Sequence, residues 1–268
     1  MEDYSVYNGE GTILRKAQLR MVDILVEIDR ICRRHDIPYW IDFGTLLGAV
    51  RHGGFIPWDD DLDISIFRQD RKSFCRYMRE ELPERFCLLD NKSVKYLKNS
   101  GIIKVMDRKS RVVEKNYEDK EIKDDYGLWV DVFCMEKGSV KFRKHINRTH
   151  GRFIRRIQGN VDDGSTNKII SYLLYPFTSL EIALYRFLHR FSGKKILIYD
   201  LKALVAKALF SKREVSQIFP LKEIEFEGHS FLCPSDPDAF LTETYRDYME
   251  IPPADKRITH ISRIEFYD

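Results

Sequence analysis

The stretch from Tyr39 to Phe67 constrains the fold more than any other part of the sequence. It runs YWIDFGTLLGAVRHGGFIPWDDDLDISIF, with apolar runs at both ends and glycine, proline and aspartate between them. YWIDF is typical of a short strand, TLLGAVRH is typical of a short helix, and Gly53-Gly54 is expected to end that helix. LDISIF alternates with period two, which places Leu62, Ile64 and Ile66 on one face of a second strand. The stretch therefore predicts strand, tight turn, helix, loop and strand.

The same alternation predicts where the carboxylates of this stretch lie. Asp61 and Asp63 fall on the strand face opposite the apolar residues, so both point the same way. Two adjacent like charges are unfavourable unless a cation compensates them, and carboxylate oxygens at this spacing suit Mg²⁺ or Mn²⁺. Asp59, on the same face but further out, is a further candidate metal ligand, whereas Asp60 is expected to face elsewhere. A solvated acidic turn is the alternative interpretation.

Two known acidic motifs compete for these residues. In an EF-hand loop, Asp59, Asp61 and Asp63 would occupy the first, third and fifth positions. That motif fails because its sixth position, which requires glycine, is Ile64, and its twelfth, which requires glutamate, is Asp70. The D-x-D motif of glycosyltransferases, which binds a nucleotide diphosphate through a divalent metal, remains possible.

A glycine-threonine pair and a third aspartate strengthen the metal interpretation. Gly44-Thr45 lies between the predicted strand and the short helix, where free backbone N–H groups and the helix dipole favour phosphate oxygens. Asp131 lies between apolar neighbours in GLWVDVF, and a two-metal site needs a third carboxylate from another strand. A phosphate-binding turn near a metal-binding carboxylate pair indicates phosphoryl transfer.

The remaining sequence predicts a mixed α/β fold. Apolar residues at steps of three and four between Thr12 and Asp36 indicate an amphipathic helix, another helix is predicted over 68–82, and FCLLD, GIIKVMDR and LWVDVFCM are predicted strands. We expect residues 1–140 to form the catalytic core. Residues 141–220, which start with basic residues and continue as apolar helical sequence interrupted by Pro176, are expected to form a helical subdomain. Residues 221–268 return to strand and turn patterns, with a helix from Asp236-Pro237, and are expected to complete the catalytic domain.

Composition limits the class of protein. The chain has 268 residues, 45 Lys+Arg and 42 Asp+Glu, and its net charge of +3 is far from the basic balance of a nucleic-acid-binding protein. Its five cysteines are scattered without a C-x-x-C pair, which is typical of buried thiols in a reducing compartment. The polar N-terminal sequence MEDYSVYNGE is unlike a secretory signal, and no window reaches the roughly 18 apolar residues of a spanning helix. We expect a cytoplasmic protein.

The stretch GTLLGAVRHGGFIPWDDDLDISI closely resembles the hallmark of the LicD family, which also includes fukutin and fukutin-related protein, within the nucleotidyltransferase superfamily. WVDVF, FEGHSFLCP and YRDYMEIPPADKRITH resemble the family more loosely. By position, Asp61 and Asp63 match the family's D-x-D, Asp131 its third carboxylate and Gly44-Thr45 its phosphate-binding turn. The chain departs from the family at Phe43 and Arg246, where glycine is usual.

The resemblance implies a nucleotidyltransferase-like mixed β-sheet with flanking helices. It also implies metal-dependent transfer of a phospho-alcohol group from a CDP-activated donor, with release of CMP. Phosphocholine from CDP-choline is the expected group, and a hydroxyl of a cell-surface glycan (lipopolysaccharide, capsule or teichoic acid) is the expected acceptor. Asp61 and Asp63 would hold the Mg²⁺ or Mn²⁺ ion, and Asp131 would either complete a second metal site or accept the proton of the acceptor hydroxyl.

Several basic residues are candidates for binding the donor phosphates. They are Arg51 and His52 at the end of the short helix, Lys104 in GIIKVMDR, and Arg257 and His260 in the tail motif. Arg51 and His52 would also favour a helix C-terminus for purely structural reasons, and Lys104 is equally compatible with simple surface exposure.

The aromatic and basic helices of residues 141–220 allow two interpretations. Either they pack on the catalytic core, or they rest on the inner face of a membrane near a lipid-linked glycan. The residues concerned are Tyr172, Tyr175, Phe177, Tyr185, Arg186, Phe187 and Arg190. For the whole chain, the alternatives are a nucleotidyltransferase that moves a nucleotide, a D-x-D glycosyltransferase, and a catalytically silent nucleotide-binding module of a polysaccharide assembly complex.

Overall fold

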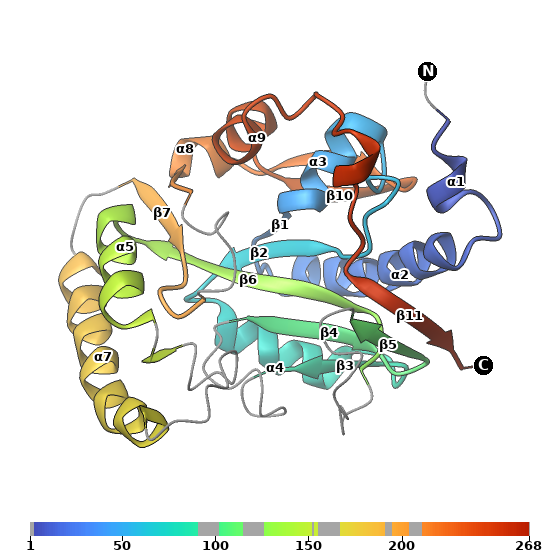
Figure 1. Ribbon diagram of the computed structural model, residues 1–268. Helices are drawn as coiled ribbons and strands as arrows, with labels where there is room; N and C mark the ends of the chain where they lie inside the picture. The colour runs from blue at the N-terminus through green and yellow to red at the C-terminus, as the bar shows by residue number, and fades with distance from the viewer. Residues whose placement is uncertain are drawn as a thin grey trace.

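A computed structural model describes residues 3–90, 102–114, 126–151, 153–154, 167–190, 195–203 and 211–267. Its helices are α1 (Ser5–Asn8), α2 (Ile13–Arg34), α3 (Phe43–His52), α4 (Arg71–Glu81), α5 (Val140–Thr149), α7 (Asn167–Arg190), α8 (Val215–Ile218) and α9 (Pro237–Tyr245), with a 3₁₀ turn at Ala254–Lys256. Its strands are β1 (Tyr39–Ile41), β2 (Asp63–Phe67), β3 (Phe86–Leu89), β4 (Ile103–Asp107), β5 (Ser110–Glu114), β6 (Trp129–Lys137), β7 (Ile196–Tyr199), β8 (Arg213–Glu214), β9 (Lys222–Phe226), β10 (His229–Cys233) and β11 (Ile261–Phe266). The predicted mixed sheet with flanking helices is confirmed (Figure 1).

A mixed sheet of seven strands forms the centre of the molecule. Its order is β1-β2-β6-β4-β3, and β7 pairs with the far end of β6 and with β8. β2 and β6 run parallel, whereas the other pairs are antiparallel. β6 is the longest strand, and its inward residues Val130 and Val132 are fully buried. The sheet is therefore built around β6, which carries Asp131.

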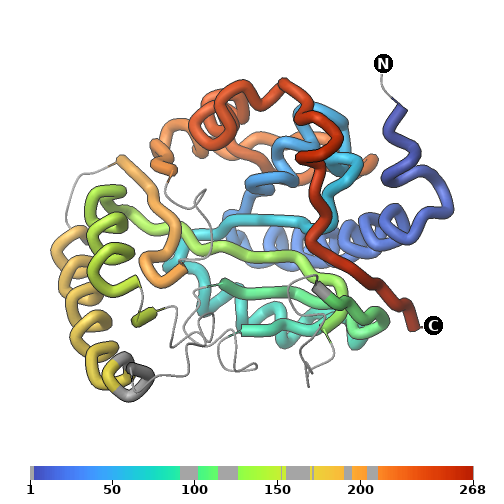
Figure 2. Tube along the Cα trace, viewed as in Figure 1, coloured from blue at the N-terminus to red at the C-terminus, as the bar shows by residue number. Residues whose placement is uncertain are grey.

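Helix α2 crosses behind the sheet and packs on it together with α4 (Figure 1). Thr12 caps α2 by accepting a hydrogen bond from the Arg15 N–H, as the sequence predicts. Helices α3, α8 and α9 and the β9-β10 hairpin gather beyond β1, and β11 returns to pair with β5 (Figure 2). Distant parts of the chain thus enclose the sheet end at which β2 begins.

The segment 141–220 differs from the helices expected there. α7 continues through Pro176, because this part of the helix is exposed and water can satisfy the carbonyl that proline leaves unpaired. Strands β7 and β8 were not predicted, because a short apolar run such as ILIY does not distinguish strand from helix. The three segment boundaries stay predictions, and Arg152, Arg155 and Arg156 of the basic run lie outside the described residues. No helix in the described ranges has the length and apolar character to cross a membrane.

Candidate active site

Three chain segments bring aspartates to one end of the sheet. Asp63 is the first residue of β2, and the parallel pairing places it opposite Asp131 of β6. On the other side of β2, the Asp42 N–H donates to the Asp63 carbonyl at 3.0 Å, just before α3 begins. The predicted convergence of the β2 and β6 aspartates is therefore present in the backbone register, and Asp42 joins them.

The strand carrying these aspartates begins later than predicted and is buried on both faces. β2 starts at Asp63, so Asp61 lies in the preceding loop instead of on the strand. Asp63 and Ser65, which alternation places on the face opposite the apolar residues, are 8% and 0% exposed. The sequence could not indicate that α3 and the C-terminal segment cover this face. The Ser65 hydroxyl donates to Asp42 Oδ2 at 2.6 Å, which satisfies a polar group that would otherwise be costly to bury.

Asp59, Asp61 and Asp63 carry more negative charge than their surroundings favour. Burial, followed by the charges of Asp131 and Asp60, raises the pKa of Asp61 to about 6. Burial and neighbouring carboxylates raise the pKa values of Asp59 and Asp63 well above the ordinary range. A hydrogen bond between the two side chains raises the pKa of Asp59 and lowers that of Asp61. A bound cation would favour the ionised forms instead.

Asp131 is held in one orientation by two donors. The Lys104 ammonium lies 3.0 Å from Oδ1, and the Trp129 indole N–H donates to Oδ2 at 3.0 Å. Lys104 Nζ also lies 3.9 Å from the centroid of the Trp129 ring and is mostly buried, because the register of β4 and β6 places Lys104 beside Asp131. Lys104 is therefore next to the aspartates and is not a freely exposed surface lysine, although its contact with phosphate stays a prediction.

Asp60 faces away from the other aspartates and binds the C-terminal tail. Its Oδ2 accepts the N–H groups of His260 at 2.7 Å and Ile261 at 2.6 Å, and its Oδ1 lies 3.2 Å from His260 Nδ1. Asp60 is 3% exposed, so these donors replace water. His260, predicted to bind the donor, thus has its backbone and ring on Asp60, although its charge also lowers the pKa of Asp61.

The first turn of α3 lies directly against the aspartates. Asp42 caps the helix by accepting the Phe43 N–H at 2.7 Å, and the Tyr199 hydroxyl donates to its Oδ2 at 2.7 Å. A Cβ atom at Gly44 would lie 2.6 Å from Asp59 Oδ2, so only glycine permits this approach. Thr45 Oγ1 accepts the Asp63 N–H at 2.8 Å, which fixes the start of β2. The phosphate-binding role of Gly44 and Thr45 stays a prediction, because Asp42 and Asp63 already use part of this turn.

The two departures from the family pattern have a common backbone explanation. Phe43 has a φ of 42° and Arg246 a φ of 63°, and both values lie in the region that favours glycine. Phe43 compensates by stacking on Tyr199 at a centroid distance of 5.1 Å. Both departures therefore preserve a backbone shape that glycine would adopt at lower cost.

Arg51 and His52 lie at the end of α3, as predicted, and Gly53 ends the helix in a left-handed conformation. Arg51 donates to the carbonyl oxygens of Tyr248 at 2.8 Å and Glu250 at 3.2 Å, so it also anchors the tail. Burial lowers the pKa of Arg51, which Asp59 partly offsets, and burial with the Arg51 charge lowers the pKa of His52 to about 4. His52 is consequently neutral at physiological pH.

Arg257 lies among aromatic rings beside the aspartate loop. Its guanidinium carbon is 4.9 Å from the Trp58 ring centroid and 5.4 Å from that of Tyr4, and its Nε donates to the Pro252 carbonyl at 2.9 Å. Since Trp58 precedes Asp59 in the chain, these contacts connect the tail to the aspartate loop. Whether Arg257 contacts a donor stays a prediction.

Three residues that lie at the aspartates were not predicted from the sequence: Asp42, Tyr199 and Tyr245. Tyr245 ends α9 and is 38% exposed as a whole, yet burial around its hydroxyl and the charges of Asp63 and Asp42 raise its pKa well above the ordinary range. The position of Asp42 before the Phe43-Gly44 turn could have indicated a helix cap. Tyr245 comes from almost two hundred residues further along the chain, and nothing in the sequence indicates its proximity.

The aspartates fit a hard divalent cation by their chemistry, because carboxylate oxygens are the ligands that Mg²⁺ and Mn²⁺ prefer. The raised pKa values of Asp61 and Asp63 mark uncompensated negative charge at the same place. In the described part of the chain, however, no group of three His, Cys, Asp or Glu side chains has the arrangement of a finished metal centre. The Asp59–Asp61 hydrogen bond would have to open for these oxygens to receive an ion.

Comparisons with known proteins give a consistent result. The family model described as LicD/FKTN/FKRP, nucleotidyltransferase domain, matches residues 36–146, which include α3, β2 and β6. The lipopolysaccharide cholinephosphotransferase LicD of Haemophilus influenzae is 24% identical over 261 residues, covering 92% of this chain and 95% of that protein.

Other relatives match only a short part of the chain. Human ribitol 5-phosphate transferase FKRP is 53% identical over 34 residues, which cover 13% of this chain and 7% of that protein. An uncharacterized protein of Rickettsia prowazekii is 47% identical over 55 residues, covering 20% of this chain and 21% of that protein. Over these short lengths, identity is about twice that found along the whole chain.

Proposed function

Because the chain belongs to the LicD family, we propose that it transfers a phospho-alcohol group, with phosphocholine from CDP-choline as the first candidate, to a hydroxyl of a cell-surface glycan. The cholinephosphotransferase match along nearly the whole chain supports this type of reaction, as does the short match to a ribitol phosphate transferase. The observation that carries the proposal is the gathering of half-buried Asp59 and Asp61 and buried Asp63 beside Asp131 at the first turn of α3, because phosphoryl transfer requires concentrated charge compensation.

The proposed reaction is an in-line displacement at the donor phosphorus. The acceptor hydroxyl oxygen forms the new bond to phosphorus, the bond to the CMP oxygen breaks, and the hydroxyl proton passes to a carboxylate. Asp131, held by Lys104 and Trp129, is our candidate for that proton acceptor. Lys104 would then remain beside the donor phosphate as a fixed positive charge.

Asp61 and Asp63, with Asp59 as a further ligand, would hold a Mg²⁺ or Mn²⁺ ion. When bound, such an ion neutralises charge on the pyrophosphate and on the departing CMP. Asp60 has a different role in this proposal. It accepts the N–H groups of His260 and Ile261 and so holds the aspartate loop against the tail. Because Gly44 has no side chain, the first turn of α3 can lie directly against Asp59.

Product analysis tests the proposal. The purified protein is incubated with Mg²⁺ and, in separate reactions, with CDP-choline, CDP-ribitol, CTP plus a sugar phosphate, and a UDP-sugar. CMP release from a CDP-alcohol supports phospho-alcohol transfer. Pyrophosphate release would instead support a nucleotidyltransferase, nucleoside diphosphate release a glycosyltransferase, and nucleotide binding without any product a catalytically silent module.

Asp61→Asn should lower CMP release by about a thousandfold, since it removes a charged metal ligand at nearly constant volume. The matched control is Asp36→Asn, which makes the same chemical change at an exposed residue after α2. If Asp61→Asn kept the rate of the control, Asp61 would not be a metal ligand.

A further inference from the structure

Helix α7 exposes an apolar surface that no described element covers. Nine of its apolar side chains face outward with exposed fractions from 37% at Leu174 to 68% at Phe177. We call this set the α7 outer face; it consists of Ile170, Tyr172, Leu173, Leu174, Phe177, Leu180, Leu184, Phe187 and Leu188. Exposed apolar residues normally occur singly, and a contiguous set marks an interaction surface.

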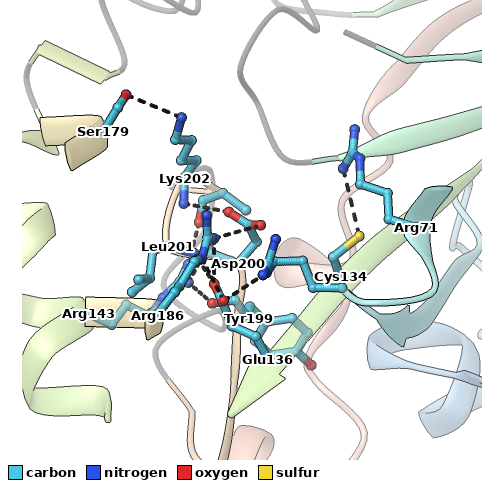
Figure 3. Close-up of polar contacts among 12 residues, drawn as sticks. Arg71, Cys134, Glu136, Arg143, Ser179, Arg186, Tyr199, Asp200, Leu201 and Lys202 are labelled. Atoms are coloured by element: carbon cyan, nitrogen blue, oxygen red, sulfur yellow. Dashed lines mark hydrogen bonds and ion pairs between the residues drawn. The ribbon is translucent and has the colours of Figure 1, made fainter. Parts of the chain in front are cut away.

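The opposite side of α7 is firmly bound to the rest of the protein. Arg186 donates to both oxygens of Glu136, at 2.7 and 2.6 Å, and to Asp200 at 3.1 Å (Figure 3). Ile182 is 1% exposed, and Tyr185 stacks on Phe142 of α5 at a centroid distance of 3.7 Å. α7 is therefore a fixed part of the fold, and its outer face is not a buried face that has come loose.

The charged residues between Ile170 and Leu188 are directed away from the outer face. Between Ile170 and Leu188 the sequence contains only two, Glu181 and Arg186. Arg186 contacts the core, and Glu181 lies 2.9 Å from His145 Nε2 and 2.6 Å from His150 Nε2. The aromatic residues noted in the sequence divide accordingly: Tyr175 and Tyr185 pack inward, whereas Tyr172, Phe177 and Phe187 face outward. The Arg190 side chain lies outside the described residues.

Helix α5 lies beside α7 at the same end of the molecule and adds positive charge (Figure 1). Its inward residues Arg143 and Ile146 are fully buried. Lys141, Lys144 and Arg148, at helical spacing on the other side, are exposed. The sequence of α5 contains no acidic residue. A basic stripe is therefore exposed on the helix that packs beside α7.

From these observations we infer that the α7 outer face and the basic stripe of α5 bind the surface of an anionic lipid bilayer. Apolar side chains would enter the boundary between headgroups and acyl chains, and Lys141, Lys144 and Arg148 would contact the lipid phosphates. The helix lies along the surface, because its inner side remains attached to Glu136 and Asp200.

The width of the outer face favours a bilayer over a second copy of the chain. Leu173, Phe177, Leu180, Leu184 and Phe187 alternate at steps of four and three, as in a coiled-coil seam. Flanking residues such as Ile170, Tyr172 and Leu188 make the apolar surface wider than the seam that a two-stranded coiled coil covers. Pro176 within the helix also disfavours a regular coiled coil. A planar lipid surface covers the whole face.

Vesicle flotation tests the inference with the full chain. The wild type should float with vesicles of equimolar phosphatidylglycerol and phosphatidylcholine, and bind less to pure phosphatidylcholine or at high salt. Phe177→Glu with Leu184→Glu should reduce the bound fraction about tenfold or more. The matched control is Val6→Glu with Ile13→Glu, which makes the same charge change at exposed apolar residues of α1 and α2. Thermal unfolding should be the same for all three proteins, since every altered side chain is exposed.

A second variant tests the basic stripe separately. Replacing Lys141, Lys144 and Arg148 by Gln should lower binding to the anionic vesicles about tenfold while changing binding to neutral vesicles little. Failure of the wild type to float with anionic vesicles at low salt would overturn the inference, as would equal binding by the α7 pair and its control. A wild-type dimer in light scattering that the α7 pair converts to a monomer, without vesicle binding, would assign the face to a second copy.

Discussion

The two ends of this protein distribute polar and apolar groups in opposite ways. At the start of β2, carboxylates are buried: Asp63 is 8% and Asp42 is 0% exposed. On α7, apolar side chains are exposed, and Phe177 reaches 68%. Burying charge and exposing apolar surface both cost free energy, so neither end is arranged for the stability of the isolated chain. The difference is the one that the two proposals require: charged ligand groups at the aspartate end and an anionic bilayer at the α7 end.

The largest expected effect separates function from stability at the aspartate end. Asp63→Asn should lower CMP release by about a thousandfold, because it removes a charge from the proposed metal site. The same change should increase the free energy of unfolding at neutral pH, since burial and nearby carboxylates disfavour the ionised side chain. Steady-state assays and urea unfolding of one protein preparation measure both quantities. A variant less stable than the wild type would show that the charge of Asp63 stabilises the fold.

Removing a charge at the helical end should have the opposite consequence for stability. Arg186→Gln removes the cation that buried Glu136 and Asp200 share, while Arg68 stays paired with Glu136 at 2.9 Å. We expect a loss of about 3 kcal/mol in the free energy of unfolding, because Asp200 loses its ion pair with Arg186. Arg30→Gln, which removes exposed ion pairs with Glu27 and Glu81, is the control and should cost less than about 1 kcal/mol. Equal effects in urea unfolding would mean that α7 is not fixed through Arg186.

Stability should also depend on pH through Asp61. Its pKa is raised from the ordinary value of 3.8 to about 6 in the folded state, so the folded chain retains a proton that the unfolded chain releases. Stability must then fall as the pH rises, by about 2 kcal/mol between pH 4.5 and 7 for this group. Urea unfolding with a chelator present measures the slope, and Asp61→Asn should flatten it. Excess Mg²⁺ should flatten the wild-type slope too; a slope unchanged by both would contradict the shifted pKa of Asp61.

The smallest expected effect concerns Tyr199 of β7, the strand that lies between the two ends. Tyr199→Phe removes the hydroxyl that donates to buried Asp42 and should cost about 1 kcal/mol of stability. Tyr248→Phe, which removes a similar hydrogen bond to Asp238 in an exposed position, should cost much less. Chemical denaturation of both variants makes the comparison. Equal losses would show that the Tyr199 hydroxyl does not hold the α3 cap.

Local patterns in the sequence predict the local parts of this structure. The Thr12 cap of α2, the end of α3 at Gly53 and the Asp236 cap of α9 depend on residues close together in the chain, and each is present. The separation of Asp60 from Asp61 also follows the pattern, although Asp61 precedes the strand instead of lying on it.

Long-range packing accounts for what the sequence does not predict. Alternation indicates which strand face is polar, but not that α3 packs against it, where Ser65 is fully buried and donates to Asp42. Tyr199 and Tyr245 approach the aspartates only because β7 pairs with β6 and α9 packs on α3. Strand β7 itself is too short to identify from its apolar residues.

Tyr199 and Asp200 are consecutive, and they hold different ends of the molecule. The Tyr199 hydroxyl supports the cap of α3 at the aspartates, while the Asp200 carboxylate binds Arg186 of α7. One planar peptide unit joins them, so the end of β7 connects the proposed membrane-binding helix to the turn beside the proposed active site. A displacement of α7 that moved β7 would be transmitted to the cap of α3 through these two neighbouring residues.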